Sequence, residues 1–419
     1  MTHADGRSLP SIGIALMAAA VLVTLVSIPC SSQAGEEGQP VSASRQGDDA
    51  AGLASGENTK DEAPEKKIET KKEKKGPTFL PIPIFITEPA IGYGLGAALT
   101  YFHRSDGDGS AASGVGPAMT MGSTETHHRR QQPPPDVTGV AAGYTDKGSW
   151  FVGIGHSGSW AKDTIRYKGA IAYADLDAEF WFFNIPLDVD IAGAMVYQNL
   201  LFRIGDSDLF LGGMLTYLNT DASPTSDDAA LPAGISEATV QDFGLGAELL
   251  YDTRDYTMTP NRGLYAELEV EKYFEGSLGD YDYWSTGVDL RSFHQLAHNK
   301  LVLGWRLKLD GVNGDPPFWA YPYITLRGVP ALRYQNQRAG EIATELRWDI
   351  LDRWAVDFFA GVGGTRGDVP LFEEEKGVVA GGIGGRYLYR PQDNLWVGVD
   401  LARGAGQWTF YVEVGQAWN

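Results

Sequence analysis

The residues of this sequence that could carry out chemistry are scattered, and none of them completes a catalytic motif. Gly155-His156-Ser157-Gly158 places a histidine beside a serine, but it lacks the glycine spacing of the turn that presents a nucleophilic serine. Glycine clusters occur at 92–96 and 361–364, and neither is followed by the helical pattern that a dinucleotide site requires. The sequence therefore predicts a protein that is not an enzyme, with a hydrolase at a barrel rim as the minor alternative.

The positions of the cysteine and histidine residues give little support for a thiol or metal site. The single cysteine, Cys30, lies in an N-terminal segment that we expect to be removed, which excludes disulfides and thiolate sites from the mature chain. His127-His128-Arg129-Arg130 lies within 104–136, where a metal or a lipid phosphate could bind, although a disordered polar loop is favoured. The sequence predicts no metal and no cofactor, because the remaining histidines show no metal-ligand spacing: His103, His156, His294 and His298.

Composition narrows the class of protein. Acidic residues outnumber basic residues by 54 to 34, which gives a formal net charge of −20 at pH 7 and argues against a nucleic-acid partner. Glycine accounts for 52 of 419 residues and aromatic residues for 11%, whereas glycine averages about 7% in soluble domains. Such a chain is expected to be rich in strands, and membrane barrels are one class with this composition.

The first 77 residues do not have the pattern of a folded domain. A weakly basic start, a low-polarity stretch at 12–28 and the small residues around Ala34 predict a secretory signal peptide over residues 1–34, with a membrane anchor as the alternative. Residues 35–77 are charged and contain no aromatic residue. We expect them to form a disordered periplasmic linker, because they cannot bury a core.

From residue 78 onward, apolar residues recur with a period of two. Large apolar side chains alternate with small or charged ones at 264–271, 301–309, 342–350, 395–402 and 408–415. This alternation places apolar side chains on one face of each strand. A soluble sandwich alternates as well, but in lipid only a closed barrel leaves no strand edge unpaired. Aromatic residues near predicted strand ends indicate the two interface girdles of a membrane barrel: Tyr273, Phe274, Trp354 and Trp418.

The turn residues divide this region into sixteen candidate strands. They are 78–87, 92–103, 137–145, 149–160, 164–175, 187–203, 208–219, 238–252, 263–274, 281–293, 299–309, 341–350, 354–363, 377–389, 394–402 and 406–418. Short turns alternate with the long loops 220–237 and 310–340, as expected when turns face the periplasm and loops face outward. The sequence thus predicts an all-β, transmembrane, antiparallel β-barrel over residues 78–419.

Several residue runs occur in an order that resembles a known family. The runs are Asp252-Thr253-Arg254-Asp255 before Pro260 and Gly263, then 314–318, Leu326-Arg327-Gly328-Val329 within 326–334, Glu345-Leu346-Arg347, and the terminus 410–419. In this order, residues 78–419 resemble the bacterial surface antigen barrels of the BamA/TamA superfamily. Residues 35–77 are too short for the soluble periplasmic POTRA repeats of that superfamily, so the chain resembles a short, barrel-only member.

The resemblance implies a sixteen-stranded outer-membrane barrel whose loop 310–340 folds into the lumen, with Arg327 and Gly328 near its tip. A guanidinium in a confined interior needs an acidic partner. The candidates are Asp357, Glu345 and Asp349, and the first two are preferred; an exposed Arg327 is the alternative. The implied function is accessory insertion or translocation of polypeptide or lipid, with outer-membrane lipid and client molecules as partners. A passive channel and a structural anchor are the alternatives.

The first predicted strand contains prolines at positions 81 and 83. Residues two apart in a strand direct their N–H groups to the same neighbour, so both prolines remove a donor from one side. If that side faces the last strand, barrel closure is weaker by about 1 kcal/mol for each missing bond. We hypothesise that this seam opens laterally, although a blunted strand start is the simpler alternative. The seam residues are Pro81, Pro83, Phe410, Val412 and Trp418.

Overall fold

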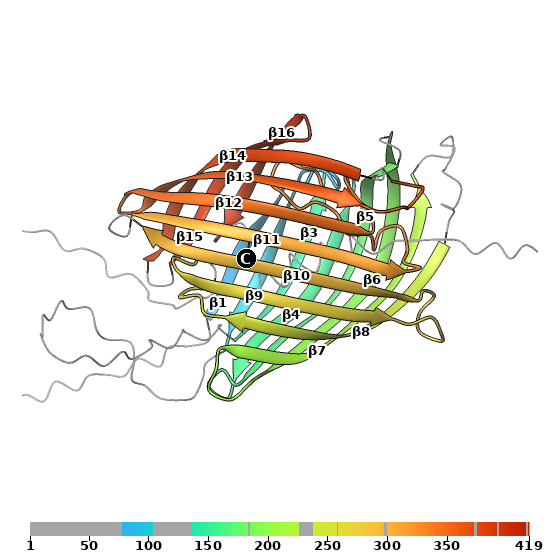
Figure 1. Cartoon of the computed structure of the whole chain (residues 1–419), viewed down its shortest axis with the longest axis horizontal. Coiled ribbons are helices and arrows are strands. Elements are labelled where there is room, and N and C mark those ends of the chain that lie inside the picture. The colour runs from blue at the N-terminus through green and yellow to red at the C-terminus, as the bar shows by residue number, and fades with distance from the viewer. Residues whose placement is uncertain are drawn as a thin grey trace, which may run out of the picture.

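A computed structural model describes residues 78–103, 136–182, 185–225, 238–257, 259–296, 300–372, 375–391, 394–415 and 418 (Figure 1). The predicted signal peptide, the predicted linker and the segment with His127 and His128 lie outside these described residues. Within the described ranges, no helix is long and apolar enough to cross a membrane.

The chain forms one antiparallel sheet in which each strand pairs with the next along the sequence, curved into a barrel (Figure 1). The strands are β1 (Thr78–Ile86), β2 (Gly94–Phe102), β3 (Val137–Thr145), β4 (Trp150–Trp160), β5 (Ile165–Phe182), β6 (Ile185–Arg203), β7 (Leu209–Pro224), β8 (Ala238–Asp252), β9 (Gly263–Tyr273), β10 (Tyr283–Leu296), β11 (Leu301–Gly314), β12 (Arg338–Leu351), β13 (Trp354–Arg366), β14 (Glu375–Arg390), β15 (Leu395–Gly404) and β16 (Gln407–Val414). The predicted all-β barrel is therefore confirmed, including the number of strands.

The polarity of β5 reverses along its length. In its first half, outward side chains such as Ile171 and Tyr173 are apolar and exposed. Beyond Ala174, the alternate positions 175, 177 and 179 are acidic and partly exposed, whereas Phe180 and Phe182 are fully buried on the inner face. The sequence prediction ended this strand at residue 175 because acidic residues at formerly apolar positions resemble a loop. The strand continues because its apolar face has exchanged sides.

The connection between β11 and β12, residues 315–337, lies inside the barrel, and we call it the lumen loop. Its Phe318 ring contacts the rings of Phe180 and Phe182, with centroids 5.0 and 5.6 Å apart. Trp319 and Leu332 of the loop are also fully buried. The loop thus supplies much of the apolar core, and the inner face of β5 is apolar because it packs against this core rather than against water.

Two of the four predicted girdle residues are buried and do not lie on the outer surface. Phe274 and Trp354 are exposed, as expected of an interface residue. Tyr273 instead is buried and stacks on Tyr283, with ring centroids 4.3 Å apart. Trp418 is also buried, and its indole lies beside Phe293 of β10. The prediction was wrong for these two residues because strand ends place aromatic rings on either face.

Candidate functional site: the lumen loop and the barrel seam

The tip of the lumen loop is a tight turn pressed against the barrel wall. The N–H of Val329 donates to the carbonyl of Leu326, at 3.0 Å, and Gly328 has a φ of +96°. A positive φ at this turn position favours glycine. A Cβ on Gly328 would also lie 2.9 Å from backbone atoms of Arg403 and Gly404 in β15. Glycine is therefore required both by the turn and by the close approach to the wall.

Arg327 connects this turn to three strands of the wall. Its guanidinium forms ion pairs with Glu345 of β12 and Asp400 of β15, and it lies 3.5 Å from the ring centroid of Phe359 in β13. Burial lowers the pKa of Arg327, but the two carboxylates more than offset this and raise it above its ordinary value. The side chain therefore remains a cation that holds the loop tip against β12, β13 and β15.

The three acidic candidates have different partners. Glu345 contacts Arg327, whereas Asp357 pairs with Arg386 of β14 at 2.9 Å and Asp349 pairs with Arg347 at 3.2 Å. The preference for Asp357 as a partner was therefore wrong. Sequence reasoning also missed Asp400, because it considered only the strands that directly follow the loop. Asp400 occupies an inward position in the alternating pattern of 395–402, and that pattern is the signal that could have identified it.

Asp400 joins two guanidinium groups into one buried network. It accepts from Arg386 as well as from Arg327, and Arg386 in turn contacts Asp357. Two guanidinium groups therefore face three carboxylates on the inner wall, counting Glu345. Ionic groups buried in this way need several well-placed partners, because desolvation of each charge costs several kcal/mol.

A second anchor lies a few residues before the turn. Both the N–H and the hydroxyl of Thr325 donate to Glu341 of β12, at 2.8 and 2.7 Å. Glu341 also faces Arg306 of β11 at 3.4 Å, and Arg306 contacts Asp289 of β10 at 2.7 Å. The lumen loop is thus held by charged groups that extend from β10 to β15.

The loop also contacts both edges of the sheet. On the β16 side, the N–H of Gly328 donates to the hydroxyl of Tyr411 at 2.9 Å. On the β1 side, the N–H of Ala331 donates to the carboxyl group of Glu88, in the β1–β2 connection, at 3.0 Å. Burial raises the pKa of Glu88 to about 7, although hydrogen bonds from Ala331 and Ala90 oppose this rise. We call these two hydrogen bonds the inner seam contacts.

The sheet order starts at β1 and ends at β16, and among the described residues no ladder pairs these two strands. On the outer surface, Tyr93 stacks on Phe410 of β16, with ring centroids 5.5 Å apart. Pro81 and Pro83 lie on β1 with exposed side chains, and their positions pair with β2 without interruption of the register. Because alternate residues of a strand bond to the same neighbour, the missing donors of the two prolines fall on one and the same edge of β1.

The remaining predicted seam residues occupy different places. Phe410 and Val412 both lie on β16. Trp418 does not lie at the seam: its ring packs beside the position of Gly304 in β11, and its carbonyl accepts from Arg291 of β10. The assignment of Trp418 to the seam was therefore wrong, because β16 ends at Val414 and the indole packs against β10 and β11 instead.

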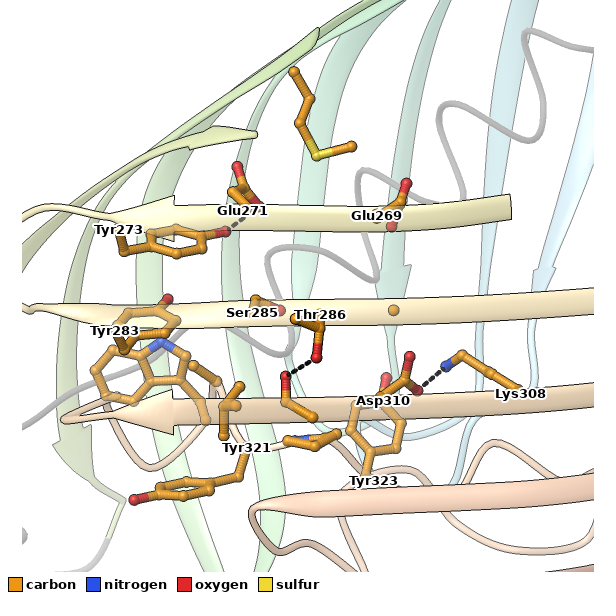
Figure 2. Close-up of a pocket in the computed structure, with 17 residues that line it drawn as sticks. Glu269, Glu271, Tyr273, Tyr283, Ser285, Thr286, Lys308, Asp310, Tyr321 and Tyr323 are labelled. Carbon is orange, nitrogen blue, oxygen red and sulfur yellow. Dashed lines mark hydrogen bonds and ion pairs between the residues drawn. The ribbon is translucent and has the colours of Figure 1, made fainter. Parts of the chain in front are cut away.

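A polar pocket of about 210 Å³ lies between the lumen loop and β9 to β11 (Figure 2). Figure 2 shows Tyr321 and Tyr323 of the loop on one side and Glu269 and Glu271 of β9 on another. Tyr273 donates to Glu271 at 2.8 Å, and Lys308 pairs with Asp310 at 2.8 Å. The pocket could hold a few water molecules or a small polar solute beside the loop.

These features define a class of protein: a transmembrane barrel of sixteen strands with an inserted, charge-anchored loop. Residues 213–318 match the family model described as the Omp85 superfamily domain. This stretch runs from β7 into the lumen loop and is about a quarter of the chain; the match agrees with the resemblance of the sequence to outer-membrane barrels. No curated protein matches it.

The fold is shared with solved structures. BamA from Haemophilus ducreyi lacking POTRA domains 1–3 aligns over 80% of this chain and 69% of that one, with 12% identity and a TM-score of 0.51. CdiB from Escherichia coli aligns over 81% of this chain, with 11% identity and a TM-score of 0.53. The match spans 63% of CdiB, less than two thirds of its length. At this identity the likeness concerns the barrel fold.

Proposed function

We propose that this protein acts as an accessory barrel that inserts or translocates polypeptide or lipid at the outer membrane through an opening between β1 and β16. The observation that carries the proposal is the lack of a β1–β16 ladder among the described residues. The other edge of β1 pairs with β2 over nine residue pairs. The edge of β1 that faces β2 is thus paired along its length, whereas the opposite edge has no strand pairing among the described residues.

The energy needed to open the seam is correspondingly small. A hydrogen bond contributes about 1 kcal/mol net, and an aromatic pair adds about 0.5–1.5 kcal/mol beyond its burial. Each inner seam contact joins one edge to the lumen loop, so separation of the edges breaks one of them together with the Tyr93–Phe410 stack, about 2 kcal/mol in all. Because both inner contacts come from the lumen loop, movement of the loop would release both edges together.

A passive diffusion channel is the second candidate, and the lumen loop argues against it. The loop is packed into the barrel through Phe318 and Trp319 and held at its tip by Arg327. A diffusion channel would show steady single-channel conductance in planar bilayers without removal of the loop. We expect low conductance from the intact protein.

Disulfide cross-linking of the seam tests the proposal. In a background with Cys30→Ala, Tyr93→Cys with Phe410→Cys joins the two edges where their rings stack. The control pair, Val399→Cys with Val412→Cys, joins residues that face each other in the intact β15–β16 ladder.

The purified proteins are placed in liposomes, and two rates are measured. One is the folding of an unfolded outer-membrane barrel substrate into the liposomes, and the other is the transfer of a fluorescent phospholipid between leaflets. The uncross-linked protein should accelerate at least one of them, which identifies the substrate class. Oxidation should suppress that rate for the seam pair only and reduction should restore it. Acceleration that persists with the seam fully cross-linked, or no acceleration at all, refutes the proposal.

A further inference from the structure

Three potential metal ligands meet on the outer surface at one end of β2, β3 and β4. His103 directly follows β2, Asp136 directly precedes β3, and His156 lies on β4. Each offers one nitrogen or oxygen atom, and the three atoms lie within 4.8 Å of one another. We propose that this cluster, which we call the rim triad, binds a divalent transition-metal cation such as Zn²⁺. The residues are far apart in the sequence, so only the pairing of neighbouring strands brings them together.

The contact between two of the ligands has the geometry of a chelating pair. The Nε2 atom of His156 lies 3.3 Å from Oδ1 of Asp136. That oxygen is buried, yet it has no hydrogen-bond partner within the described part of the chain. Zinc binds imidazole nitrogen and carboxylate oxygen at about 2.0–2.2 Å, and tetrahedral ligands at those distances lie about 3.3 Å apart. The two atoms therefore have the separation of neighbouring ligands on one ion.

Gly158 leaves space beside both donor atoms. A Cβ on this residue would lie 3.1 Å from Nε2 of His156 and 3.2 Å from Oδ1 of Asp136. A side chain there would occupy the space next to the chelating pair. The same Cβ would lie 2.9 Å from Nε1 of Trp160, so glycine lets the three side chains come together at this point.

The residues around the triad orient its ligands. The Thr138 hydroxyl oxygen lies 2.7 Å from Nε2 of His103 and 2.8 Å from Nδ1 of His156. A hydroxyl can accept two hydrogen bonds, so both rings can donate to Thr138 at once. That tautomer leaves the other nitrogen of each ring free to bind a cation. Trp160 donates its indole N–H to Oδ2 of Asp136 at 3.3 Å, which leaves Oδ1 as the ligand atom. Such partners fix ring orientation in known metal sites.

The ligand types decide the class of metal. Two imidazoles and one carboxylate, without a thiolate, suit Zn²⁺ and its first-row neighbours rather than Ca²⁺ or Mg²⁺, which prefer oxygen ligands. Three protein ligands leave a fourth position for water or an external group. A bound ion would tie together β2, β3 and β4, next to the edge strand β1.

Zinc titration of the full chain, purified in detergent without a histidine tag, tests the proposal. His127→Gln with His128→Gln serves as the background, because this pair could bind zinc independently. We expect one equivalent of Zn²⁺ to bind, measured by competition with a chromogenic chelator. His103→Gln, Asp136→Asn and His156→Gln should each weaken binding at least tenfold. The control His294→Gln, on β10, should leave it unchanged.

Two further readouts separate loss of the site from loss of the fold. His103 is exposed, so its replacement by glutamine should leave the heat-modifiable band of the folded barrel unchanged in gel electrophoresis. Co²⁺, used as a probe, should give the strong visible absorption of a four-coordinate site in the background protein and lose it in folded His103→Gln. Zinc affinity that is equal in the background and in folded His103→Gln, or no stoichiometric binding at micromolar Zn²⁺, overturns the proposal.

Discussion

Replacement of Arg327 by alanine tests whether the buried ion pairs hold the lumen loop in place. The change removes one of the two cations that face Glu345, Asp357 and Asp400. Removal of one partner from a buried pair costs about 3–5 kcal/mol, because a carboxylate is left in low dielectric. Arg386 still contacts Asp400, which places the expected loss at the lower end, about 3 kcal/mol.

The measurement is a urea titration of the detergent-folded barrel, followed by the heat-modifiable band. Arg327→Lys keeps the charge but not the planar fork that reaches two carboxylates, so an intermediate loss is expected. The matched control is Arg333→Ala in the same loop. Arg333 lies over the ring of Trp181 at 4.5 Å, a contact worth about 0.5–1 kcal/mol. If Arg327→Ala costs no more than Arg333→Ala, the ion pairs do not anchor the loop.

Three further changes test the loop, the seam and the chain end. Gly328→Ala should lower the free energy of unfolding by more than 1 kcal/mol in the same urea titration, because residue 328 has a positive φ and a Cβ there would clash with β15. The control Gly385→Ala should have little effect, because a Cβ at position 385 meets nothing within 4 Å. The Glu88 pKa is raised from 4.5 to about 7, so the folded state favours the protonated carboxyl group. The free energy of unfolding should therefore fall by up to about 3 kcal/mol as pH rises from 4.5 to 7. Glu88→Gln should lose this dependence in melting temperatures measured across that range, and an unchanged slope would contradict the assignment. Trp418→Ala should cost about 3 kcal/mol through the cavity that it leaves beside Phe293, and an unaltered urea midpoint would show that the indole does not pack there.

The repeating strand pattern was predictable because the barrel wall has two different solvents. Lipid on one side and lumen on the other impose a period of two on every strand, and turn residues separate the strands. The pattern failed where the environment changed, as in β5 beyond Ala174. There the outer face carries acidic side chains and the inner face packs against the lumen loop, so the apolar positions move to the opposite parity. Residues 220–224 and 310–314 were likewise predicted as loop but belong to β7 and β11.

The partners of buried charges were less predictable. Glu345 and Asp400 lie on strands that are far apart in the sequence, yet both reach Arg327 because the barrel curves around the loop. Alternation identifies which acidic residues face inward, but it does not specify which of them meets a given guanidinium. The same limitation applies to the rim triad, whose members belong to three neighbouring strands.

The reversal in β5 also means that one strand is stabilised in two ways. Before Ala174 the outward side chains are apolar and exposed, as expected of side chains that face lipid. After Ala174, the rings of Phe180 and Phe182 pack against Phe318 in an apolar core like that of a soluble domain. This second half of β5, unlike the half that faces lipid, depends on the hydrophobic effect in water, which urea weakens directly. Its amide protons should therefore exchange with solvent at lower urea concentrations than those of the embedded half of the same strand.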